Sequence, residues 1–150
     1  MNISENLLKR LADEAESIPN PASDEELVKL KEHNADGDTL EYFAKYNLEC
    51  DIDMVTLDDA VNNLDCMGFA TPDCEVWQHG FIPFGRDFGG RTYCFDQNDR
   101  DQEGSSKIVR LSYSFGEDTN PKEISKASEA IADNLNLFLE LYLDSKVESM

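Results

Sequence analysis

The residues best suited to metal chemistry lie in the polar run DQNDRDQEG, from Asp96 to Gly104. Read as a calcium loop, its first, third, fifth and sixth positions would be Asp99, Asp101, Glu103 and Gly104. Position 12 would then be Arg110, whereas a calcium loop needs a bidentate glutamate there. Because this closing ligand is missing, we expect a polar hairpin loop here and no metal site.

Nucleophilic or acid–base chemistry would depend on the two histidines, His33 and His79. Neither neighbours a Ser or Cys in a known nucleophile arrangement. Carboxylate pairs are frequent in so acidic a chain, and so they do not by themselves indicate catalysis. A small hydrolase is therefore the least favoured function class, and we expect no catalytic residues. A cavity lined by His79 and two carboxylates would favour that class.

The glycines and cysteines also lack the spacing of ligand sites. Gly85, Gly89 and Gly90 are not accompanied by the Lys and Ser/Thr of a phosphate-binding loop, so we expect a hairpin turn with positive φ at Gly89 or Gly90. Four cysteines are separated by 16, 8 and 20 positions, which excludes a CxxC zinc knuckle: Cys50, Cys66, Cys74 and Cys94. We expect reduced, partly buried thiols and no cofactor.

The charge of the chain narrows the classes of partner. Thirteen basic and 32 acidic side chains give a net charge of −19 over 150 residues. Such a field repels phosphate backbones and anionic lipid headgroups, so nucleic-acid and membrane partners are disfavoured. The N-terminal stretch MNISENLLKRLADEAES has the pattern of an acidic amphipathic helix and not of a secretion signal, so a cytoplasmic protein is expected.

One segment is anomalous, because the 40 residues from Tyr46 to Gly85 contain no Lys or Arg and eight acids. This pattern is typical of a solvated acidic face, and it also suits a surface that binds a basic protein. Tryptophan is enriched at the centres of interfaces, although a lone Trp in a strand is more often in the core. The candidate partner-binding residues are Asp51, Asp53, Asp58, Asp59, Asp73, Glu75 and Trp77.

The elements that must position these residues begin with helices. Apolar spacing predicts a first helix over 4–17, and a capping box formed by Ser23 and Glu26 predicts the start of a second. A third, short helix is expected around Leu40 to Tyr46, capped by Asp38 or Thr39. Residues 52–57 suggest one strand, and 58–64 a helical turn.

The second half of the chain predicts a sheet and a final helix. β-rich runs separated by Gly, Asp and Asn are expected to form an antiparallel meander: Val76–Trp77, Phe81–Phe84, Thr92–Phe95 and Ile108–Tyr113. Apolar residues at helical spacing from Ile124 to Tyr142 predict one long C-terminal helix. This order predicts an α+β domain with a mostly antiparallel sheet, flanked by N-terminal helices and a long C-terminal helix, in which the second face of the sheet can be left open.

The run FIPFGRDFGGRTYCFD, Phe81 to Asp96, resembles the central motif of the SUKH superfamily, which includes a fungal cell-wall-synthesis regulator and bacterial toxin-immunity proteins. The turn and fold positions of the motif are matched by Pro83, Gly85, Asp87, Gly89, Gly90 and Asp96. Weaker similarity extends the region to 20–141 of a single domain over 1–150, with an N-terminal helix over 1–19 and a tail over 142–150. Phe88 stands where the family often has Gly.

The resemblance implies an α+β domain without known catalytic residues that acts as an intracellular immunity protein. Such proteins are thought to bind and neutralise toxins, many of them nucleases, and a basic nuclease would complement the charge of this chain. The expected function is therefore binding of a protein partner, and the expected partner is a basic toxin domain. A regulatory or scaffold domain that joins a cellular assembly is the alternative.

Overall fold

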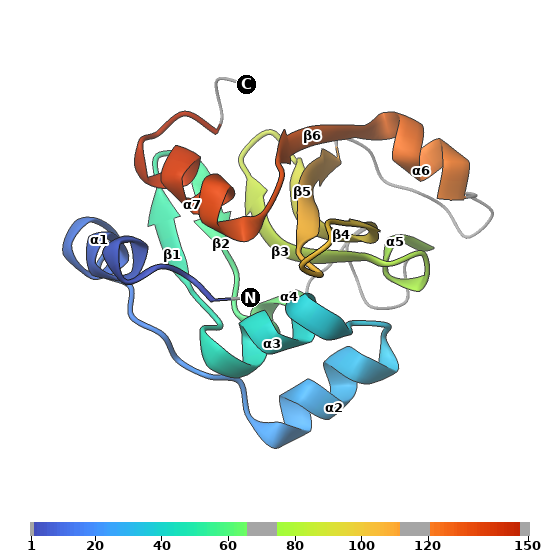
Figure 1. The fold of residues 1–150 in the computed structure, drawn as a ribbon, viewed down its shortest axis with the longest axis horizontal. Helices are drawn as coiled ribbons and strands as arrows, with labels where there is room; N and C mark the ends of the chain where they lie inside the picture. The colour runs from blue at the N-terminus through green and yellow to red at the C-terminus, as the bar shows by residue number, and fades with distance from the viewer. Residues whose placement is uncertain (1, 66–74, 112–120, 148–150) are drawn as a thin grey trace.

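The computed structural model describes residues 2–65, 75–111 and 121–147 (Figure 1). Cys66, Asp73 and Cys74 lie outside these ranges. The described strands form one six-stranded antiparallel sheet in which every strand pairs with its neighbours in sequence, in the order β1-β2-β3-β4-β5-β6. The strands are β1 (Cys50–Ile52), β2 (Val55–Leu57), β3 (Phe81–Asp87), β4 (Thr92–Arg100), β5 (Ser106–Leu111) and β6 (Ser128–Ala132). The predicted α+β class and antiparallel meander are confirmed.

Local signals set the starts of the first two helices, α1 (Glu5–Ala15) and α2 (Asp24–Glu32). The Ser4 side chain accepts a hydrogen bond from the Leu7 backbone and caps α1. At α2 both halves of the predicted capping box are present, with Ser23 and Glu26 each accepting from the other's backbone N–H. Both predicted starts are confirmed because each depends on a few adjacent residues.

Helix α3 (Gly37–Lys45) begins earlier than predicted, since its N-cap is Asp36 and not Asp38 or Thr39. The reason is that the Asp38 carboxylate is buried against the sheet. It accepts hydrogen bonds from the backbone and hydroxyl of Ser106, both at 2.7 Å, and from Arg100 Nε at 3.1 Å. Asp38 was predicted as a cap from its neighbours in sequence, but its carboxylate binds residues of the sheet that are distant in sequence.

The segment predicted as a single strand over 52–57 is a hairpin of two strands, β1 and β2. A two-residue turn joins them, because Ile52 pairs directly with Val55. The first turn residue, Asp53, has a left-handed backbone with φ 54°, which Asp tolerates better than most residues. The short helix α4 (Ala60–Leu64) follows, as predicted, with Asp59 as its cap.

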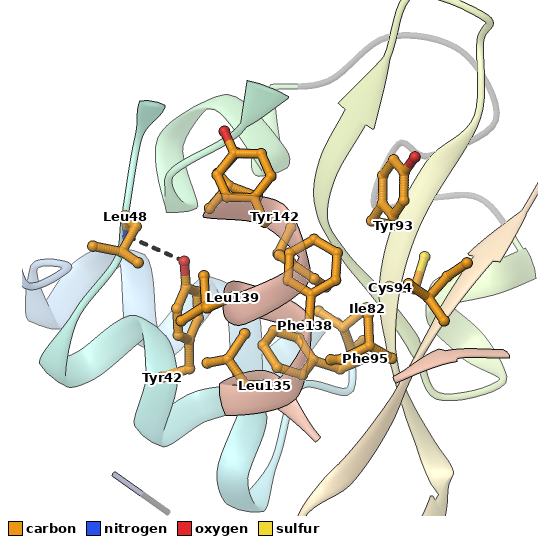
Figure 2. Close-up of a cluster of buried hydrophobic side chains, with 14 of the residues drawn as sticks. Tyr42, Leu48, Ile82, Tyr93, Cys94, Phe95, Leu135, Phe138, Leu139 and Tyr142 are labelled. Atoms are coloured by element: carbon orange, nitrogen blue, oxygen red, sulfur yellow. Dashed lines mark hydrogen bonds between the residues drawn. The ribbon is translucent and has the colours of Figure 1, made fainter. Parts of the chain in front are cut away.

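Helices α3 and α7 (Leu135–Leu143) pack on the same face of the sheet through an aromatic cluster (Figure 2). Tyr42 of α3 contacts Phe84 and Phe95, and Phe138 of α7 contacts Phe84 and Tyr93, with ring centroids 5.2–6.3 Å apart. The Tyr42 hydroxyl also accepts a hydrogen bond from the Leu48 backbone at 3.1 Å. This cluster is the centre of the core.

The central strands are buried on both faces. Residues 81–85 of β3 and 92–96 of β4 are all buried, although their side chains alternate between the two faces. The expectation of an open sheet face is therefore wrong for these strands. Val76 and Trp77, predicted as a strand, belong to the short helix α5 (Glu75–Gln78), which packs on β3.

The single C-terminal helix predicted over 124–142 is also wrong. The structure has α6 (Pro121–Ala127), then β6, then the nine-residue helix α7. Residues 128–132 pair with β5, and Glu129 lies opposite Arg110 and forms an ion pair with it at 2.9 Å. Pairing with the sheet thus overrides the helical spacing, and the Asn134 side chain starts α7 afresh by capping it.

The two ends of the chain are joined, because α1 packs against α7 (Figure 1). The Ser4 backbone donates to the Asn136 side chain at 3.0 Å, and Arg10 forms an ion pair with Asp144 at 2.9 Å. Helix α1 also contacts β1. The N-terminal helix is thus held between the first strand and the last helix.

Candidate functional site

The central motif folds as the β3–β4 hairpin, and Asp87 organises its turn. The buried Asp87 carboxylate accepts hydrogen bonds from the Gly89 and Arg91 backbones at 2.9 and 3.1 Å, from Arg91 Nε at 2.8 Å and from the Tyr93 hydroxyl at 2.9 Å. One side chain therefore satisfies two backbone and two side-chain donors. This explains structurally why the turn holds Asp at this position.

Two glycines of the motif meet backbone requirements. Gly90 has φ 80°, as predicted for one of the hairpin glycines, whereas Gly89 does not lie in the left-handed region. At Gly85, a Cβ atom would lie 2.9 Å from the Thr56 carbonyl oxygen, so a larger residue would force β2 and β3 apart. The pairing of β3 with β4 shifts register between Pro83 and Gly85. These motif residues shape the hairpin.

The predicted acidic residues of the base-free segment lie on the β1–β2 hairpin and on the start of α4. Asp51 is on β1 and hydrogen-bonds Thr56, Asp53 is in the turn, and Asp59 caps α4. Asp58 is buried and forms an ion pair with Arg86 at 3.2 Å. The structure thus brings four of the seven candidates to one edge of the sheet.

The other three candidates do not add to this surface. Asp73 lies outside the described residues, as does the side chain of Glu75. Trp77 is 0% exposed and its ring contacts His33 edge-on, so it belongs to the core. We therefore leave Trp77 out of the candidate contact surface.

The pKa of Asp58 is raised, in part by the negative charges of the acidic edge. Burial raises the pKa of this carboxyl, Arg86 opposes the rise, and the negative charges of Asp59 and Glu49 add to it. Within residues 2–65, 75–111 and 121–147, no Lys or Arg forms an ion pair with any of five nearby carboxylates, namely Glu49, Asp51, Asp53, Asp59 and Asp65. The edge therefore carries uncompensated negative charge.

Most basic side chains, by contrast, are already neutralised. Ion pairs with carboxylates hold Arg10, Lys29, Lys45, Arg86, Arg91, Arg100, Lys107 and Arg110. The pairs formed by Arg100 and Arg110 use carboxylates far along the chain and tie helices and strands together. The carboxylates in excess of these cations therefore give the surface its negative charge.

Sequence reasoning missed two exposed apolar residues at the hairpin tips. Phe88, at the tip of the β3–β4 hairpin, is 80% exposed, and Met54, in the β1–β2 turn, is 50% exposed. The two tips are adjacent, since the Phe88 backbone donates to the Met54 carbonyl at 3.3 Å. A signal existed for Phe88, because it interrupts a turn otherwise made of Asp, Gly and Arg.

The run from Asp96 to Gly104, which resembles a calcium loop, covers the end of β4 and most of the polar connection to β5. A polar hairpin loop was predicted here. Asp101 accepts hydrogen bonds from the Glu103 and Ser105 backbones, and Asp99 is paired with Lys107 at 2.9 Å. These carboxylates therefore stabilise the loop itself. In the described part of the chain, no three His, Cys, Asp or Glu side chains are grouped so as to hold a metal ion.

His79 lines a polar cleft of about 550 Å³ between α5, the α2–α3 connection and β4. The described lining supplies one carboxylate, Asp36, which is held by Arg100 at 2.6 Å. Amide side chains make up much of the rest, and Gln97 bonds the Asn34 and Asp36 backbones. A hydrolase would be favoured by His79 together with two carboxylates. The described residues that line this cleft do not form that arrangement.

Two of the four cysteines are described: Cys50 and Cys94 are both buried, and neither forms a disulfide bond. The prediction of reduced thiols is confirmed for these two. Burial raises the pKa of the Cys50 thiol, while its hydrogen bonds with Tyr142 and Ser17 oppose the rise, so its thiolate is disfavoured at neutral pH.

Among the described helices, none has the length and apolar character needed to cross a bilayer.

Asp96, the last motif residue, gives a pH-dependent prediction. Burial raises the pKa of its carboxyl, so the folded state binds a proton more readily than the unfolded state. Protonation of Asp96 therefore stabilises the folded protein. This contribution is complete below pH 3.8, the pKa of Asp96 in the unfolded chain, and it is lost as the pH rises through the higher pKa of Asp96 in the folded protein. We expect Asp96→Asn to be more stable than the wild type at pH 7, with a gain that shrinks toward pH 3.5, as measured by urea unfolding across that range.

The matched control is Glu103→Gln, which removes one negative charge from the exposed β4–β5 loop. It separates the effect of burial from a general relief of charge repulsion. An Asp96→Asn gain that did not change with pH, or that matched the gain of Glu103→Gln, would contradict the prediction.

No protein-family model matches this chain, and no curated protein matches it either. The resemblance to the SUKH superfamily therefore rests on the residues of the central motif and on the weaker similarity around it. The structure defines the class of the protein as an α+β domain with an acidic edge and two apolar hairpin tips.

Proposed function

We propose that this chain is a non-enzymatic protein-binding module that acts in the cytoplasm and recognises a basic protein, namely a toxin domain that it neutralises as an immunity protein. The observation that carries this proposal is the acidic edge: in the part of the chain that the structure describes, Asp58 is paired with Arg86, while Asp51, Asp53 and Asp59 have no Lys or Arg partner. Such a field attracts and orients a basic partner. The buried thiols of Cys50 and Cys94, which form no disulfide bond, suit a reducing compartment.

The test is co-expression with the product of the neighbouring open reading frame, followed by purification and titration calorimetry at increasing salt. We expect one dominant complex whose affinity falls by about tenfold or more between low and high ionic strength, because screening weakens exposed charge pairs. No complex, or a complex indifferent to salt, would overturn the proposal. A pull-down from the native host that returned many partners in similar amounts would instead favour the scaffold alternative.

A further inference from the structure

Two apolar side chains project from neighbouring hairpins at one end of the sheet. Phe88 and Met54 are among the most exposed large apolar side chains of the described chain, and their backbones are hydrogen-bonded to each other. Single exposed apolar residues are ordinary, but adjacent ones on two separate turns form a patch. Turns are usually built from Gly, Asn, Asp, Pro and Ser, so neither turn needs these side chains for its own geometry.

The patch continues into a groove. A cleft of about 380 Å³ begins at Met54 and runs between β1, β2 and the end of α7, lined by Ile52, Asp53, Val55, Tyr142, Ser145 and Val147. Its volume is at the lower end of the range for sites that bind small molecules and is sufficient for a side chain of a partner. Most of its walls are apolar, and Asp53 stands at its edge. A hydrophobic centre with a polar rim is the usual anatomy of a protein interface.

The charges around the patch favour a basic partner. The two arginines that flank the β3–β4 turn are paired with carboxylates, Arg86 with Asp58 and Arg91 with Asp87. Asp51 and Asp53, on the adjoining hairpin, are not paired with a described cation, so the net field around the patch is negative. A second copy of this chain would bring another −19 charges toward it and would be repelled.

Resting on the proposed function, we infer that this surface, which we call the hairpin-tip patch (Met54 and Phe88 with the adjoining cleft), is the docking site of the basic partner. Phe88 is the anchor, inserted between apolar side chains of the partner, and Lys or Arg residues of the partner lie over Asp51 and Asp53. The acidic edge provides attraction at a distance, and the patch provides the desolvated contact that slows dissociation.

The experiment uses the full chain and the partner purified from the co-expression complex. Titration calorimetry compares the wild type with Phe88→Ala and Met54→Ala. The matched control is Val28→Ala, which removes a 57% exposed apolar side chain from α2, at the opposite end of the molecule (Figure 1). We expect affinity to fall by about 10- to 100-fold for Phe88→Ala and by a smaller factor for Met54→Ala, with Val28→Ala within about twofold of the wild type.

The outcomes separate this inference from the proposed function. If the wild type binds and both patch variants bind equally well, the docking site is overturned while the binding function stands. If the wild type forms no complex, both are overturned. If sedimentation shows that the wild type alone dimerises and Phe88→Ala is monomeric, the patch is a self-association surface and the inference is wrong. Equal melting temperatures for the wild type and Phe88→Ala establish that any loss of affinity is not a loss of folding.

Discussion

Replacing Asp87 by alanine is expected to lower the free energy of unfolding by about 3–5 kcal/mol, the usual cost of removing one partner from a buried charged pair. The substitution leaves the Gly89 and Arg91 backbones, the Arg91 guanidinium and the Tyr93 hydroxyl without their shared acceptor. The Asp87 side chain itself is fully buried, so water does not reach it in the folded protein. Urea unfolding followed by circular dichroism measures the change.

Asp101→Ala is the matched control, because Asp101 accepts from two backbone N–H groups in the same geometry but in an exposed loop. There water replaces the lost acceptor, so the cost should be about 1 kcal/mol or less. Asp87→Asn should lie between the two, since an amide keeps one acceptor oxygen. Equal costs for Asp87→Ala and Asp101→Ala would show that Asp87 does not organise the hairpin.

The second large effect is expected at Phe138, whose truncation to alanine should cost about 3–5 kcal/mol. Phe138 is a fully buried residue of α7 that packs on the sheet, with its ring 5.2 Å from Phe84 and 5.9 Å from both Tyr93 and Tyr142 (Figure 2). Removing it opens a cavity at the centre of the aromatic cluster, and the surrounding rings can collapse only partly. The measurement is again the free energy of unfolding in urea.

The neighbouring Leu137 provides the control, since it lies on the same helix and is 43% exposed. Leu137→Ala should change stability by about 0.5 kcal/mol or less. Because both substitutions alter helix propensity only slightly, the difference between them measures burial against the sheet. Similar losses for Phe138→Ala and Leu137→Ala would mean that α7 does not form the core.

Elements with local signals could be predicted from the sequence. The cap of α1 and the capping box of α2 involve residues three positions apart, so no knowledge of the rest of the chain is needed. The same holds for the glycine turn of the β3–β4 hairpin. Where distant partners compete, prediction fails: β5 draws residues 128–132 into the sheet although their spacing is helical. Asp38 is lost as a cap for the same reason.

The candidate site was predicted in part. The absence of Lys and Arg between 46 and 85 located the acidic edge, because nothing nearby in the sequence could neutralise it. Trp77 was misplaced, since a β-prone pair such as Val76-Trp77 is compatible with a buried helical turn. Phe88 and Met54 were missed because their exposure depends on which hairpins lie side by side, which is a property of the whole sheet. Contact of any of these residues with a partner stays a prediction.

The packing of α1 against α7 has a consequence for biosynthesis. Every strand pair in the sheet is formed by consecutive strands, so hairpins can assemble as the chain leaves the ribosome. The contacts between Ser4 and Asn136 and between Arg10 and Asp144 span 132 and 134 positions, so they cannot form until α7 has been synthesised. Helix α1 can meet β1 early, but its packing is completed only when α7, made more than a hundred residues later, reaches it.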